Sequence, residues 1–126
     1  MTGIDEIVSA YGAAWTDVDD AERQRLLEIA WSEDGVYQDP TADVSGREAL
    51  ARHIAGFRKR LPGSEIVITS GVDHHHGKFH FLWKMVGPDG QTVLEGRDFG
   101  ELDLNGRIRC IAGFFGPPPP LAGAGA

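Results

Sequence analysis

The amino-acid sequence predicts one α+β domain in which the helices come first and the strands last. Over most of residues 3–61, apolar side chains recur every three or four positions, which is the period of a helix packed on a core. From Glu65 to Phe115 the apolar and polar residues alternate instead, which is the period of a strand. A chain of 126 residues has the usual size of a single domain. Segregated helices and strands predict the α+β class rather than α/β.

The first half contains three predicted helices and a short strand. We expect helices over residues 3–16, 19–34 and 45–61, and a strand over residues 36–39 that Pro40 stops. The second and third helices each open with Asp or Ser followed three positions later by Glu, the pattern of a capping box.

The second half is predicted to be a meander. Its strands are expected at residues 65–72, 75–86, 92–103 and 107–115. Asn105-Gly106 is typical of a tight hairpin turn, because both residues tolerate positive φ values. The domain is therefore expected to occupy residues 1–116, and the Pro/Gly/Ala-rich residues 117–126 to form an extended or disordered tail.

Composition excludes several classes of function. Twelve basic against nineteen acidic residues give a net charge of −7, so nucleic acid is not an expected partner. The only cysteine, Cys110, cannot form an internal disulfide, which fits a reducing compartment. We find neither a signal peptide nor an apolar run of about 18 residues that could span a membrane, so the chain is expected to be soluble and cytoplasmic.

Three polar residues are candidates for a functional site. Asp98 shares one face of its predicted strand with Leu94, Gly96, Gly100 and Leu102, and a carboxyl in such an apolar row has a raised pKa. The flanking glycines either leave room for a ligand or mark a bulge. The structural alternatives are an aspartate on the exposed face after a register slip, or one that is hydrogen-bonded to nearby backbone.

Asp39 and Tyr11 are the other two candidates. Asp39 ends a strand before Pro40 and could lie at a cavity mouth, but an aspartate before proline is common in turns, so spacing alone favours a loop or capping carboxylate. Tyr11 lies on a buried helical stripe, so its hydroxyl needs either an internal partner or a ligand.

The run His74-His75-His76 does not indicate a metal site. Successive strand residues point to opposite faces, so the three imidazoles cannot converge on one ion. A hairpin-end or core histidine is the favoured interpretation, although His75 shares its row with Phe79, Phe81 and Trp83 and could line a pocket.

Taken together, these positions resemble the nuclear transport factor 2-like superfamily, including Δ5-3-ketosteroid isomerase and the SnoaL-like polyketide cyclases. The matching segments are Tyr11 to Trp15, Asp34 to Pro40, and Asp98 to Ile108 with its hairpin glycine. The resemblance implies a cone-shaped barrel of strongly curved antiparallel or mixed sheet, closed by about three helices around a pocket. It also implies Asp39 as general base, and Tyr11 with a protonated Asp98 as oxyanion donors.

The residues predicted to line that pocket are mainly aromatic. They are Trp15, Trp31, Phe57, His75, Phe81, Trp83 and Phe115. The expected ligand is a small hydrophobic carbonyl compound or a phenol, and no metal or other cofactor is expected. Apolar residues on both faces of the strands, such as Phe81 against Leu82, also predict a homodimer.

Several activities fit these residues. The leading hypothesis is proton abstraction next to a carbonyl, as in an isomerase. An aldol-type cyclase would use the same base. An epoxide hydrolase is disfavoured, because related limonene epoxide hydrolases carry an arginine two residues from an aspartate on one strand face, whereas Arg97 adjoins Asp98. A non-catalytic binding or assembly module is the alternative from another class.

Overall fold

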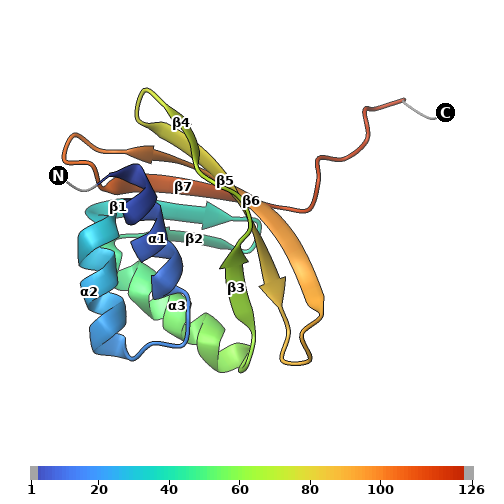
Figure 1. Cartoon of the computed structure of the whole chain (residues 1–126), viewed down its shortest axis with the longest axis horizontal. Helices are drawn as coiled ribbons and strands as arrows, with labels where there is room; N and C mark the ends of the chain where they lie inside the picture. Colours follow the sequence, from blue (N-terminus) through green and yellow to red (C-terminus); the bar gives the residue numbers. More distant parts are fainter. Residues whose placement is uncertain (1–2, 124–126) are drawn as a thin grey trace.

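The computed structural model describes residues 3–123, which contain three helices and a seven-stranded sheet (Figure 1). The helices are α1 (Ile4–Ala14), α2 (Asp20–Ala30) and α3 (Arg47–Arg60). The strands are β1 (Trp31–Asp39), β2 (Ala42–Ser45), β3 (Glu65–Ile68), β4 (Asp73–His75), β5 (Lys78–Val86), β6 (Thr92–Leu102) and β7 (Ile108–Phe115). The predicted α+β class is confirmed.

The sheet is mixed and curled. Its strand order is β2-β1-β7-β6-β5-β3, with β4 paired to β5, and β1 lies parallel to β7 while the other pairs are antiparallel. Within residues 3–123 the sheet stays open, with β2 and β3 at its edges. The expected cone-shaped barrel is therefore not closed. The three helices gather on one side of the sheet (Figure 1).

The second helix ends four residues earlier than expected. Trp31 continues the helical spacing from Leu27, yet it starts β1 and pairs with Ile108 of β7. Its side chain is fully buried, and a Cβ at Gly35 would lie only 2.5 Å from Trp31 Nε1. Tertiary packing of this indole against a glycine therefore overrides the local helical pattern.

The predicted capping box at Ser45 is not used. Ser45 ends β2, where it pairs with Val36, and the N-cap of α3 is Gly46 with a φ of 95°. The Gly46 N–H donates to the carbonyl of Gly35 at 2.9 Å, which fixes the turn from the hairpin into the helix. Only glycine adopts that backbone conformation without strain.

The strand predicted over residues 75–86 is a hairpin followed by a longer strand. His76 and Gly77 have φ values of 51° and 75°, and they connect β4 to β5. Two successive positive φ values are typical of the tight turn that joins antiparallel strands.

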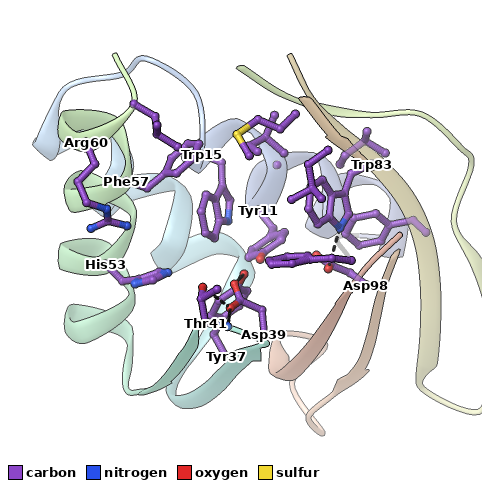
Figure 2. A pocket seen from close by; sticks show the side chains of 18 residues that line it. Tyr11, Trp15, Tyr37, Asp39, Thr41, His53, Phe57, Arg60, Trp83 and Asp98 are labelled. Carbon is purple, nitrogen blue, oxygen red and sulfur yellow. Dashed lines mark hydrogen bonds between the residues drawn. The ribbon is translucent and has the colours of Figure 1, made fainter. Parts of the chain in front are cut away.

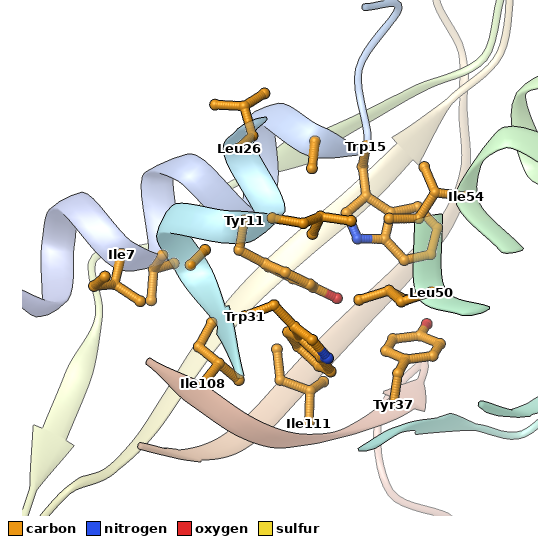
Figure 3. Close-up of a cluster of buried hydrophobic side chains, with 14 of the residues drawn as sticks. Ile7, Tyr11, Trp15, Leu26, Trp31, Tyr37, Leu50, Ile54, Ile108 and Ile111 are labelled. Carbon is orange, nitrogen blue, oxygen red and sulfur yellow. The ribbon is translucent and has the colours of Figure 1, made fainter. Parts of the chain in front are cut away.

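The core lies between the helices and the inner face of the sheet (Figure 3). Leu27, Trp31, Leu50 and Ile54 are fully buried there, together with Ile108. Residues 117–123 form neither helix nor strand and run away from the domain (Figure 1), while the rest of the predicted tail, residues 124–126, lies outside the described residues. None of the described helices is both long and apolar enough to cross a membrane.

Candidate functional site

A cavity of about 260 Å³ opens between α1, α3 and the inner face of the sheet (Figure 2). The structure brings Tyr11, Asp39 and Asp98 together on its wall, although they are far apart in the sequence. Most of the remaining wall is apolar or aromatic. It comprises Gly12, Trp15, Tyr37, Thr41, His53, Phe57, Arg60, Leu61, Ile66, Ile68, Phe81, Trp83, Met85, Leu94 and Phe115.

Asp98 lies in the middle of β6, opposite Phe81 on one neighbouring strand and Gly113 on the other. Its side chain faces the cavity side of the sheet and the residue is only 6% exposed. The Trp83 indole N–H donates to Asp98 Oδ1 at 2.9 Å. Because Oδ1 is engaged in this bond, a proton on the carboxyl belongs on Oδ2.

The pKa of Asp98 is raised to about 7, chiefly by burial; the hydrogen bond from Trp83 lowers it, and the negative charge of Asp39 raises it. Desolvation disfavours the charged form of a carboxyl. A substantial fraction of Asp98 is therefore protonated at neutral pH and able to donate a hydrogen bond.

The two glycines that flank Asp98 serve the neighbouring aromatic rings rather than a ligand or a bulge. A Cβ at Gly96 would lie 2.1 Å from the Trp83 ring, and one at Gly100 would lie 2.3 Å from the Phe79 ring. Each ring belongs to the residue paired across the β5–β6 ladder. The missing side chain at Gly96 thus leaves room for the Trp83 indole, which donates its hydrogen bond to Asp98.

A third glycine separates the two carboxylates. A Cβ at Gly113 of β7 would lie 2.9 Å from Asp98 Oδ1 and 3.4 Å from Asp39 Cβ. The two acidic side chains therefore approach the same point of the β7 backbone from opposite sides, which explains why the charge of Asp39 acts on Asp98.

Asp39 ends β1, where the chain reverses into β2. Its Oδ1 accepts hydrogen bonds from the Thr41 backbone N–H at 2.7 Å and the Thr41 hydroxyl at 2.8 Å. Its Oδ2 accepts one from the Tyr37 hydroxyl at 2.5 Å. Burial, followed by this bond and the charge of Asp39, raises the pKa of Tyr37, so Tyr37 remains a donor. The turn predicted from Asp-Pro therefore also holds the carboxylate at the cavity.

Tyr11 projects from α1 between two tryptophans (Figure 3). Its ring stacks on Trp31 at 5.5 Å between centroids and meets Trp15 edge-on at 6.4 Å. Burial, and next the charge of Asp98, raises the pKa of Tyr11 well above its ordinary value. The phenol is therefore protonated across the physiological range and can act as a donor at the cavity.

Five of the seven predicted lining residues, namely Trp15, Phe57, Phe81, Trp83 and Phe115, contact the cavity, and Trp31 and His75 lie outside it. Trp31 lies behind Tyr11 in the core, where its stacked ring supports the tyrosine. His75 ends β4 beside the hairpin turn, so its exposed side chain belongs to a groove formed by β4, β5 and neighbouring strands. Its Nδ1 lies 3.1 Å from Nδ1 of His76.

Sequence reasoning missed four polar lining residues: Tyr37, Thr41, His53 and Arg60. Helical spacing could have found two of them, because His53 and Arg60 flank Phe57 on one face of α3. The pKa of His53 is lowered, chiefly by burial. The negative charge of Asp39 raises this pKa, and the positive charge of Arg60 lowers it. His53 is therefore neutral at pH 7.

Comparison with solved structures identifies the family. A proposed isomerase of the SnoaL-like family from Agrobacterium tumefaciens is 33% identical, over 88% of this chain and 95% of that chain, with a TM-score of 0.83. The chain belongs to the SnoaL-like family. No protein-family model matches this SnoaL-like chain, and no curated protein matches it in sequence.

More distant structures show the same fold. A proposed SnoaL-like polyketide cyclase from Jannaschia is 15% identical over 91% of this chain and 89% of that one, with a TM-score of 0.67. A nuclear transport factor 2-like protein of unknown function from Cytophaga hutchinsonii is 12% identical over 93% of each chain, with a TM-score of 0.68. The predicted resemblance to this superfamily is confirmed.

Arg97 does not join the site. Its Nε donates to the carbonyl of Gly116 at 3.0 Å, and its guanidinium lies 5.3 Å from the centre of the Phe114 ring. Adjacent strand residues face opposite sides of a sheet, so Arg97 points away from Asp98. The arginine–aspartate pair of an epoxide hydrolase is not formed by these two residues.

Proposed function

We propose that this SnoaL-like protein is an enzyme that abstracts a proton next to a carbonyl group in a small apolar ligand. The observation that carries the proposal is a buried carboxyl with a pKa of about 7, Asp98, on the same cavity wall as Tyr11 and across Gly113 from Asp39. Two neutral donors and one separate carboxylate form an acid–base set suited to an enolate. The family relatives described as a proposed isomerase and a proposed cyclase support this chemistry.

In the proposed reaction, Asp39 removes a proton from the carbon next to the carbonyl. The electron pair of the broken C–H bond moves into the carbonyl, and the oxygen becomes an enolate. Tyr11 and protonated Asp98 donate hydrogen bonds to that oxygen, each contributing on the order of 3 kcal/mol in a site with little water. Return of the proton to another carbon gives an isomer, whereas attack of the enolate carbon on a second carbonyl gives a cyclised product.

A second function rests on how tightly Asp39 is held. Three hydrogen bonds from Tyr37 and Thr41 would anchor this side chain in the β1–β2 turn even without a reaction. In that case the cavity binds a phenol or carbonyl compound and leaves it unchanged. The two functions differ only in whether Asp39 exchanges a proton with the ligand.

Deuterium exchange separates them. Wild-type protein in D2O is incubated with a panel of small cyclic enones, and incorporation at carbon is followed by mass spectrometry. We expect Asp39→Asn to reduce the exchange rate by a factor of at least about 100, while binding of a planar phenol stays within about twofold. Asp43→Asn, an exposed change on β2 outside the cavity, is the control. Equal exchange by Asp39→Asn and wild type would assign Asp39 to the turn alone.

A further inference from the structure

The cavity has a basic wall that the proposed proton transfer does not use. His53 and Arg60 of α3 line the cavity on the side away from Asp98 (Figure 2). Phe57 lies between them on the same helix face, and Trp15 contacts both Phe57 and His53 edge-on. A ligand that reaches from Asp98 to this wall would pass along aromatic rings and end at a positive charge.

Arg60 differs from most arginines of the described chain. Seven others donate hydrogen bonds to backbone carbonyls or carboxylates: Arg23, Arg25, Arg47, Arg58, Arg97, Arg107 and Arg109. Arg60 and Arg52 make no hydrogen bond or ion pair with residues 3–123, and of these two only Arg60 lines the cavity. A guanidinium at a cavity with no protein partner is free for an anion.

Gly56 shapes the position of Arg60. A Cβ at Gly56 would lie 3.2 Å from Arg60 Nη1, so the guanidinium folds back along α3 over a residue that has no side chain. This places its charge near His53, whose pKa it lowers. Since His53 is neutral, Arg60 supplies the positive charge of this wall.

The size of the cavity limits the ligand. At about 260 Å³ it lies below the range of about 300–1,000 Å³ that is usual for drug-sized ligands. One or two fused rings fit this space better than a four-ring skeleton. Guanidinium groups recognise carboxylates in a planar, two-pronged geometry.

We propose that the cavity binds a one- or two-ring carbonyl or phenol compound that also carries a carboxylate, and that Arg60 binds this carboxylate. The placement of the other ligand oxygen at Tyr11 and Asp98 rests on the proposed function, whereas the contact with Arg60 does not. The alternative role of Arg60 is to complement the helix dipole, since Arg58, Lys59 and Arg60 all lie in the last turn of α3.

The test compares two probes that differ by one carboxylate, 2-naphthol and 6-hydroxy-2-naphthoate. Their dissociation constants are measured by calorimetry for wild type, for Arg60→Gln, and for the control Arg52→Gln on the same helix. We expect Arg60→Gln to raise the dissociation constant of 6-hydroxy-2-naphthoate about fivefold to tenfold, and to change that of 2-naphthol by less than about twofold. The first effect is modest because Arg60 is solvent-exposed. Arg52→Gln should change neither constant.

The two probes also separate this inference from the proposed function. The carboxylate contact is wrong if 2-naphthol binds but the carboxylate of the second probe adds no affinity. It is also wrong if Arg60→Gln weakens the binding of both probes equally. In both cases the proposed role of Tyr11 and Asp98 as oxyanion donors is upheld. If only 6-hydroxy-2-naphthoate binds, and Arg60→Gln abolishes the binding, the carboxylate contact stands and the oxyanion arrangement fails. Binding of neither probe overturns both.

Discussion

Replacing Asp98 with Asn should change how the stability of the protein depends on pH. The carboxyl has an ordinary pKa of 3.8 when unfolded and about 7 in the folded protein. Between these values the folded state holds a proton that the unfolded state releases, so the folded state binds more protons and the free energy of unfolding falls as pH rises. A pKa difference of this size corresponds to at most about 4 kcal/mol between pH 4 and pH 7. The loss is complete about one pH unit above the folded pKa.

An asparagine cannot ionise, yet its carbonyl still accepts the Trp83 hydrogen bond. Urea denaturation of wild type and Asp98→Asn between pH 4.5 and pH 8 measures the effect. We expect similar stabilities at pH 4.5 and a variant that is more stable by up to about 4 kcal/mol at pH 8. Asp17→Asn, in an exposed loop, is the control for loss of a carboxylate. A stability difference between wild type and Asp98→Asn that stays constant with pH would refute the burial argument.

Two further predictions concern the surroundings of the site. Gly113→Ala should destabilise the fold by about 1–3 kcal/mol, because its Cβ would meet Asp98 Oδ1 at 2.9 Å, and it should also weaken phenol binding. Urea denaturation and calorimetry measure both effects, and a neutral result would mean that the site has room for a methyl group at Gly113. We also expect a homodimer through the outer sheet face, where Leu82, Phe99 and Phe114 are 41%, 41% and 46% exposed. Light scattering should give twice the chain mass for wild type and the single mass for Phe99→Glu, whereas a monomeric wild type would contradict this.

The sequence predicted the class of the fold because its two periods are well separated along the chain. It failed where a tertiary contact overrode a local signal. Trp31 fits the helical spacing, but its indole packs in the space above Gly35, and the residue starts β1 instead of continuing α2. Ser45 with Glu48 has the form of a capping box, but pairing with Val36 places Ser45 in β2.

The candidate site was predictable for a different reason. Strand alternation places Asp98 on the inner face, and that inference needs no knowledge of the other strands. Gly96 and Gly100 were misread because the rings that fill their space come from β5, whose register against β6 the sequence does not specify. Arg60 was missed because a charged residue in the last turn of a helix is usually explained by the helix dipole.

A double-mutant cycle on phenol binding tests the central claim, that Tyr11 and protonated Asp98 donate to one ligand oxygen, most directly. The dissociation constant of 2-naphthol is measured at pH 6 for wild type, Tyr11→Phe, Asp98→Asn and the double variant. Asparagine keeps a donor, so Asp98→Asn should be the milder single change. The double variant should lose less binding free energy than the two single variants together, with a coupling of about 0.5–3 kcal/mol. Additive losses, or binding that neither single variant weakens, would contradict the claim.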